Sequence, residues 1–111
     1  MRNYKTYKHK GKEFRVYIWE NKKIKDFKYP KSFRMAKFQE FVDLYDSGKI
    51  ELEVWKYYYV KHFSKIQQTK EYCLSWLYLG RFSDLSSGIV DLAYSDGSGR
   101  VCIVKENKND K

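Results

Sequence analysis

Cationic and aromatic side chains are interleaved in the first third of the chain, a pattern typical of nucleic-acid binding. Ammonium and guanidinium groups bind phosphates, and aromatic rings stack on bases. The candidate contact residues are Lys8, Lys10, Lys12, Arg15, Tyr17, Trp19, Lys22, Lys23, Lys25, Lys28, Lys31, Arg34 and Lys37. Among them, Arg15, Tyr17 and Trp19 are the candidates for reading bases or stacking on them, and most of the lysines would contact phosphates.

The net charge of the chain is confined to this region. Residues 1–37 carry 13 Lys and Arg against 3 Asp and Glu, a net charge of +10, whereas residues 38–111 carry 10 and 11, a net charge of −1. The sum is the +9 of the whole chain. We therefore expect a non-catalytic nucleic-acid-binding protein, with DNA favoured over RNA and no cofactor.

Two other function classes stay open. The same cations would fit an acidic protein surface, so a protein-interaction module or regulator is one alternative, and a homodimer is a further option. A small metal-independent ribonuclease is the other, because general acid–base groups and a cationic clamp are present. Its residues would be His62, Lys56, Lys61, Tyr58 and Arg81.

Metal chemistry is not expected. Cys73 and Cys102 lack the short spacings of zinc sites, and Asp91 and Glu106 lack the strand pattern of metal nucleases. Both cysteines stand in apolar runs, so we predict two reduced thiols that face the core of an intracellular, cytoplasmic protein.

Length and composition predict a single domain over residues 1–111. The chain is 42% hydrophobic and 19% aromatic, too apolar for intrinsic disorder. No apolar run approaches the roughly 18 residues of a membrane span, and we expect no membrane association. The chain is rich in Lys, Tyr, Asn, Ile and Phe and poor in Ala, Pro and Gly, a composition that favours an AT-rich genome. Phages, viruses and plasmids often have such genomes, so the expected setting is the cytoplasm of an infected host cell.

Strands are predicted at residues 4–10, 13–19 and 24–29, with tight turns between them. The second strand alternates strictly, so that Phe14 and Val16 face the core while Tyr17 and Trp19 lie on the opposite face. That opposite face either binds a ligand or covers a second, smaller core, and the sequence leaves both possibilities open.

A helix is predicted over residues 32–47, with Ser32 as its N-cap and Gly48 as the left-handed residue after its end. Its apolar stripe consists of Met35, Phe38, Phe41, Val42 and Tyr45. The basic residues at its start, Lys31, Arg34 and Lys37, predict an anion site at the helix N-terminus.

The near-neutral part, residues 38–106, is expected to be scaffold. We predict a long strand at 50–63, a turn at 64–70, and a strand rather than a short helix at 72–82. A loop at 83–88 would precede a hairpin of strands 89–94 and 100–105, followed by a frayed tail at 107–111. The fold class is therefore α+β: an antiparallel sheet of about five to seven strands, with one main helix packed on one face.

Residues 4–45 loosely resemble the three-strand-plus-helix module of phage-integrase arm-binding domains. The likeness rests on the segments YKHKGKEFRVYIW, KKIKDF and KSFRMAKFQEF and covers about a third of the chain. The resemblance implies strands that enter the major groove of DNA, with the helix packed behind them.

Overall fold

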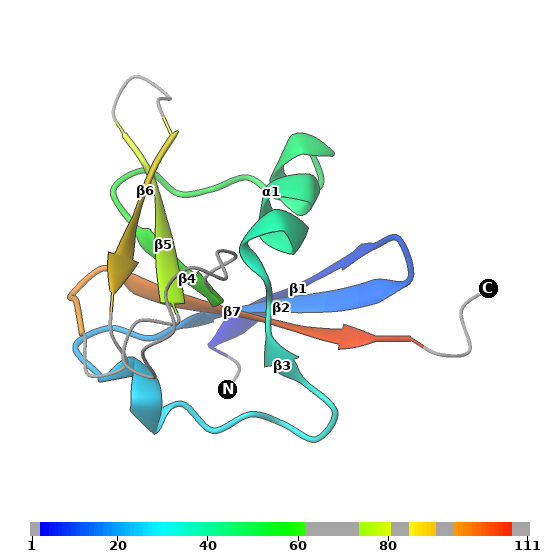
Figure 1. Cartoon of the computed structure of the whole chain (residues 1–111), viewed down its shortest axis with the longest axis horizontal. Coiled ribbons are helices and arrows are strands. Elements are labelled where there is room, and N and C mark those ends of the chain that lie inside the picture. Colours follow the sequence, from blue (N-terminus) through cyan, green and yellow to red (C-terminus); the bar gives the residue numbers. More distant parts are fainter. Residues whose placement is uncertain (1–2, 62–73, 81–84, 91–94, 108–111) are drawn as a thin grey trace.

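A computed structural model describes residues 3–61, 74–80, 85–90 and 95–107 of the chain. This part contains a seven-stranded, mostly antiparallel sheet and one α-helix, which confirms the α+β class. The elements in chain order are β1 (Tyr4–His9), β2 (Lys12–Ile18), the 3-10 helix η1 (Ile24–Asp26), β3 (Arg34–Met35), α1 (Phe38–Asp46), β4 (Tyr57–Lys61), β5 (Leu74–Leu79), β6 (Leu85–Val90) and β7 (Gly99–Glu106). The strands lie in the order β1-β2-β7-β4-β5-β6, and β3 pairs with β7 outside this order (Figure 1).

The last strand of the chain, β7, lies in the middle of the sheet. β2 pairs with it in antiparallel fashion along one edge. On the other edge, β4 runs parallel to residues Gly99–Val101, and β3 pairs antiparallel with Ile103 and Val104. The four residues from Val101 to Val104 are completely buried. A strand covered on both faces is expected to be continuously apolar, and this segment is.

The sheet buries one hydrophobic cluster on each face. The first cluster includes Phe41 and Leu44 of α1 and Cys102 of β7. The second cluster consists of Ile24, Phe27, Met35, Tyr59, Val101 and Ile103. Successive β7 side chains enter opposite clusters, as the pleat of a strand requires. Figure 1 shows α1 and the segment that contains η1 on opposite sides of the β2–β7 pair.

The hairpin of β1 and β2 is confirmed, with its turn at Lys10–Gly11. These residues have φ angles of 50° and 73°, and His9 pairs with Lys12 across the strands. Left-handed values at both central positions are typical of the type I′ turn, whose twist matches that of a two-residue hairpin.

The strand predicted at residues 24–29 is wrong. Residues 24–26 form η1, the chain then continues irregularly, and β7 occupies the place beside β2. Ile24 and Phe27 are both buried, and their spacing of three matches one turn of a 3-10 helix. The three consecutive strands implied by the likeness to arm-binding domains are therefore absent from the described chain.

The helix predicted at residues 32–47 is shorter, because α1 begins at Phe38. Ser32 has a φ of 72° and is not the N-cap, and the residues that follow it form β3 instead. Met35 is buried in the second cluster rather than on the helix stripe, since pairing with β7 places it there. Gly48 has a φ of 79°, which confirms the predicted left-handed residue after the helix.

The long strand predicted at residues 50–63 is wrong in its first half, because β4 begins at Tyr57. Ile50 and Leu52 are buried, as the alternation predicted. The chain that carries them is irregular, and Trp55 has a φ of 68°, a value incompatible with a strand. The strand favoured within residues 72–82 is confirmed by β5.

The hairpin predicted from residues 89–94 and 100–105 is also wrong. β6 includes residues 85–88, which were predicted as loop, and it pairs with β5, whereas β7 pairs with β2, β3 and β4.

The predicted turn at 64–70 lies outside the described residues. The first residue of the predicted frayed tail is held, because the Asn107 amide donates a 2.9 Å hydrogen bond to the Gly11 carbonyl.

Gly99 provides a test of this packing. A Cβ atom at this position would lie 2.5 Å from the Trp19 carbonyl oxygen and 3.0 Å from the Tyr59 ring, which is completely buried. We expect Gly99→Ala to lower the free energy of unfolding in urea by about 1–3 kcal/mol, because neither neighbour can move aside. Gly97→Ala is the matched control, since its Cβ would meet only the Asn21 side chain, at 3.5 Å. Equal effects of the two variants would contradict the close approach.

Candidate nucleic-acid interface

The predicted contact residues fall into two groups in the structure. Lys12, Arg15 and Arg34 form ion pairs within the protein, and the rings of Tyr17 and Trp19 are half-buried. The other eight are exposed lysines that form no ion pair with any described residue: Lys8, Lys10, Lys22, Lys23, Lys25, Lys28, Lys31 and Lys37. Only this second group can offer its charge directly to a partner.

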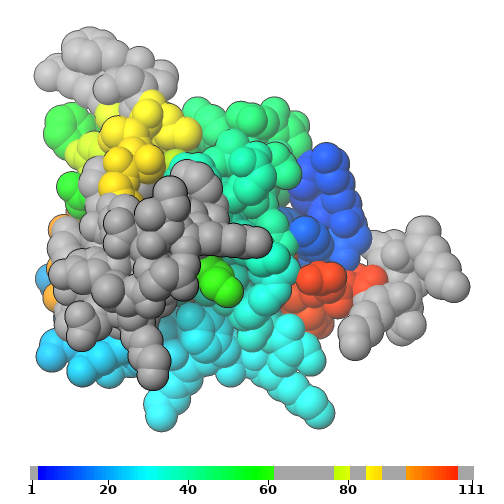
Figure 2. All heavy atoms as spheres, in the orientation of Figure 1, coloured from blue at the N-terminus to red at the C-terminus, as the bar shows by residue number. Residues whose placement is uncertain are grey.

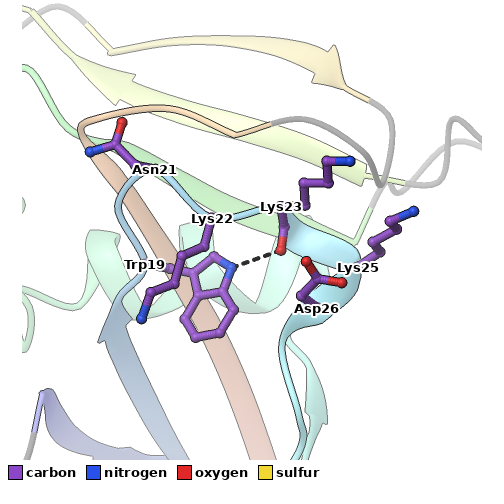
Figure 3. A pocket seen from close by; sticks show the side chains of 6 residues that line it. All are labelled: Trp19, Asn21, Lys22, Lys23, Lys25 and Asp26. Atoms are coloured by element: carbon purple, nitrogen blue, oxygen red, sulfur yellow. Dashed lines mark hydrogen bonds between the residues drawn. The ribbon is translucent and has the colours of Figure 1, made fainter.

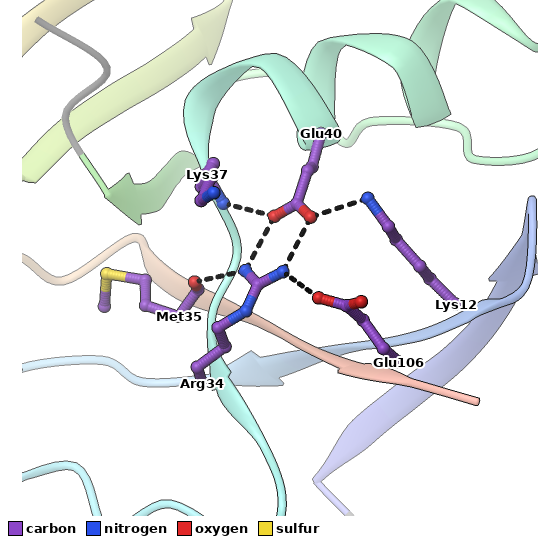
Figure 4. A network of polar contacts seen from close by, with 6 residues as sticks. All are labelled: Lys12, Arg34, Met35, Lys37, Glu40 and Glu106. Carbon is purple, nitrogen blue, oxygen red and sulfur yellow. Dashed lines mark hydrogen bonds and ion pairs between the residues drawn. The ribbon is translucent and has the colours of Figure 1, made fainter. Parts of the chain in front are cut away.

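The ion pairs of Lys12 and Arg34 converge on Glu40, in the first turn of α1 (Figure 4). Arg34 donates one hydrogen bond to each carboxylate oxygen of Glu40, both at 2.8 Å, and also pairs with Glu106 at 3.1 Å. The Lys12 ammonium and the Lys37 backbone amide each donate to Glu40 at 2.8 Å. This network ties α1 to β2, β3 and β7.

Glu40 is held in its ionised form. Burial by itself raises the pKa of its carboxyl, but the hydrogen bonds from Arg34, Lys12 and the Lys37 amide outweigh burial and lower the pKa to about 2. Lys37 is the N-cap residue of α1, and the Glu40 side chain accepts the hydrogen bond from its backbone amide. The anion site predicted at the helix N-terminus is therefore filled by the protein's own carboxylate, and Arg34 is committed to it.

Arg15 is enclosed by aromatic rings. Its guanidinium carbon lies 4.7 Å from the centroid of the Tyr4 ring and 4.4 Å from that of Phe33. It donates to the Tyr17 hydroxyl at 3.3 Å, and this hydrogen bond raises the pKa of Arg15. Its Nε lies 3.4 Å from Glu13. These contacts hold the guanidinium against the protein surface. There, the cation–π contacts between Arg15 and the two rings stabilise the second cluster.

Tyr17 and Trp19 pack against the second cluster. Each ring meets Phe27 edge-on, with centroids 5.0 Å apart, and the Trp19 indole N–H donates to the Lys23 carbonyl at 2.9 Å. The aromatic face of β2 thus covers a smaller core, one of the two possibilities that the alternation left open. Segment 20–33 supplies the residues that cover it.

An open hollow of about 610 Å³ lies at the exposed side of Trp19 (Figure 3). The residues around it are Trp19, Asn21, Lys22, Lys23, Lys25 and Asp26. The Lys22 ammonium lies over the indole, 4.8 Å from the ring centroid, while Lys23 and Lys25 extend away from the ring. Three of the predicted contact lysines therefore meet at one concave surface beside one of the predicted aromatic residues.

Within the described part of residues 1–37, the predicted contact set left out one exposed lysine. Lys5, on the edge strand β1, is exposed and forms no ion pair with a described residue. Lys5 follows Tyr4 in a predicted strand, where successive side chains point to opposite faces, and this alternation could have identified it as exposed.

Of the residues suggested for a ribonuclease, the structure describes Lys56, Tyr58 and Lys61. The Tyr58 side chain is buried, and its hydroxyl accepts a 2.9 Å hydrogen bond from the Glu53 amide. Burial raises the pKa of Tyr58, so it is a poor proton donor or acceptor at neutral pH. His62 and Arg81 lie outside the described residues.

Cys102 is a free, buried thiol, as predicted, and burial raises its pKa; Cys73 lies outside the described chain. The described residues hold no group of three or more His, Cys, Asp or Glu side chains placed to bind a metal ion.

Comparisons with family models, with curated protein sequences and with solved structures found no match to this chain. Across the described ranges, no helix has the length and apolar character needed to cross a membrane.

The Glu40 network makes stability depend on pH in a defined window. The pKa of Glu40 falls from its ordinary 4.5 to about 2 on folding, so its contribution is complete above pH 4.5 and is lost as the pH falls toward 2. We expect Glu40→Gln to lower the free energy of urea unfolding at pH 7 by about 1–3 kcal/mol and to flatten its fall between pH 4.5 and 2.

Glu51→Gln is the control for this prediction, because Glu51 is exposed and forms no ion pair with a described residue. An unchanged pH profile in Glu40→Gln would show that other carboxyls dominate acid unfolding.

Proposed function

We propose that this protein binds nucleic acid without catalysing a reaction on it, and that DNA is preferred over RNA. The observation that supports this most strongly is the concentration of exposed lysines on one irregular segment. We call residues 22–31 the basic segment; its lysines are Lys22, Lys23, Lys25, Lys28 and Lys31. In Figure 2 this cyan part of the chain projects along the lower rim of the molecule.

The charge of the basic segment is largely unopposed. The two carboxylates that precede it are neutralised by other cations: Glu13 by Arg15 and Lys105, and Glu20 by Arg100. Opposite charges in an ion pair largely cancel each other's field, whereas exposed cations attract a polyanion from a distance. Asp26 is the one acidic residue within the segment.

The division of the cations also indicates how binding would work. Arg15 and Arg34, the two cations suited to bidentate contacts, are engaged by rings and carboxylates of the protein. Lysine ammoniums act as point charges and contact phosphates with little regard to sequence. We therefore propose that phosphate contacts supply most of the affinity.

Affinity should depend steeply on salt. If the five lysines of the basic segment each neutralise one phosphate of duplex DNA, the slope of log affinity against log salt should be about −4.5. The variant Lys22→Gln/Lys23→Gln/Lys25→Gln should reduce this slope to about −2, as measured by fluorescence anisotropy over a salt series.

A charge-matched variant, Lys49→Gln/Lys56→Gln/Lys61→Gln, controls for net charge, because these lysines lie elsewhere on the fold. It should leave the slope near that of the parent protein. Equal changes in both variants would mean that only total charge matters, and no binding to DNA or RNA at low salt would exclude the proposed function.

A further inference from the structure

We propose that the hollow beside Trp19 receives one nucleotide of a single strand, whose base stacks on the indole while the neighbouring phosphates contact Lys23 and Lys25. This inference rests on the proposed function and assigns a site to it. The volume of about 610 Å³ lies within the range of small-molecule sites. A stacking contact would add a base-dependent contribution to the phosphate contacts.

The wall of the hollow is held in place by backbone hydrogen bonds to the first residue of β7 and to the chain just before it. The Trp19 amide donates to the Gly99 carbonyl at 3.0 Å, and the Asn21 amide donates to the Asp96 carbonyl at 2.8 Å. Asn21 itself has a φ of 58°, which fixes the turn between Trp19 and the lysines. A site that is formed before binding loses little entropy when the ligand arrives.

The indole is oriented for a planar ligand. Its N–H is bonded to the Lys23 carbonyl and one side packs against Phe27, so the ring cannot rotate freely. Among the side chains that line the hollow, the Lys22 ammonium lies over this ring, 4.8 Å from its centroid (Figure 3). A lysine side chain is flexible and can exchange this cation–π contact for a phosphate when a base takes its place.

The charges around the hollow place the phosphate and the base differently. Three ammoniums face one carboxylate, that of Asp26. A phosphate is favoured beside Lys23 and Lys25 and repelled by Asp26. A base, being neutral, tolerates the carboxylate and can donate an N–H hydrogen to it, as the N3–H of thymine can. Duplex DNA offers no exposed base face, so the site selects a single strand.

The test compares two oligonucleotides with equal numbers of phosphates: a twelve-residue oligothymidylate and its abasic counterpart. The parent protein should bind the oligothymidylate about tenfold more tightly, as measured by fluorescence anisotropy at constant salt. Trp19→Leu should abolish this preference while leaving affinity for the abasic strand within about twofold. Trp55→Leu is the matched control, because Trp55 is an exposed indole that does not line the hollow, and it should keep the preference.

Lys22→Ala tests the same site without disturbing the packing around Phe27. It should weaken binding of the abasic strand and preserve or increase the preference for bases, since it uncovers the indole. Equal binding of the two strands by the parent protein, or a preference that survives Trp19→Leu, would overturn the inference and leave phosphate binding intact. Failure of both strands, and also of duplex DNA and of RNA, to bind at low salt would instead exclude the proposed function itself.

Discussion

The burial of β7 is the constraint on which the rest of the structure depends. Its central residues are completely buried, and its backbone pairs with β2 on one edge and with β4 and β3 on the other. Because successive side chains of a strand point to opposite faces, this one strand needs a cover on each side. α1 supplies the first cover and the segment around η1 supplies the second. Gly99 allows the close approach of Trp19 and Tyr59 at its beginning.

The segment that covers the second cluster also determines which cations are exposed to solvent. Segment 20–33 turns its apolar residues, Ile24 and Phe27, toward the sheet and leaves its lysines in solvent. The described arginines behave differently, because guanidinium groups stack on rings and form paired hydrogen bonds with carboxylates. Arg34, for example, holds the fold together through Glu40. The exposed cations of the basic segment are all lysines, which favours contacts to phosphate over readout of base edges.

Local features of the fold were predictable where local chemistry determines them. The hairpin of β1 and β2 and the glycine after α1 were predicted, because they follow from alternation and from a left-handed turn residue. The strand β5 was favoured over a short helix, although periodicity does not separate the two in a short apolar run. The helix start, the expected third strand and the last hairpin were predicted wrongly. In each case the competing conformation was chosen by pairing with β7, which lies some 60 or more residues away in sequence from β3 and η1.

The sequence by itself determined the asymmetry of charge, the class of the fold and the two-sided character of β2, since composition and alternation depend on covalent order alone. Only the tertiary structure decided that Tyr17 and Trp19 cover a second core. It also decided that the Glu40 carboxylate, paired with Arg34, accepts the hydrogen bond from the backbone amide at the start of α1. The tertiary structure likewise decided that Lys22, Lys23 and Lys25 line one hollow beside the Trp19 indole. The physical reason is that a cation or a ring has no preferred partner until folding brings distant groups within contact, and the lowest free energy then selects among them.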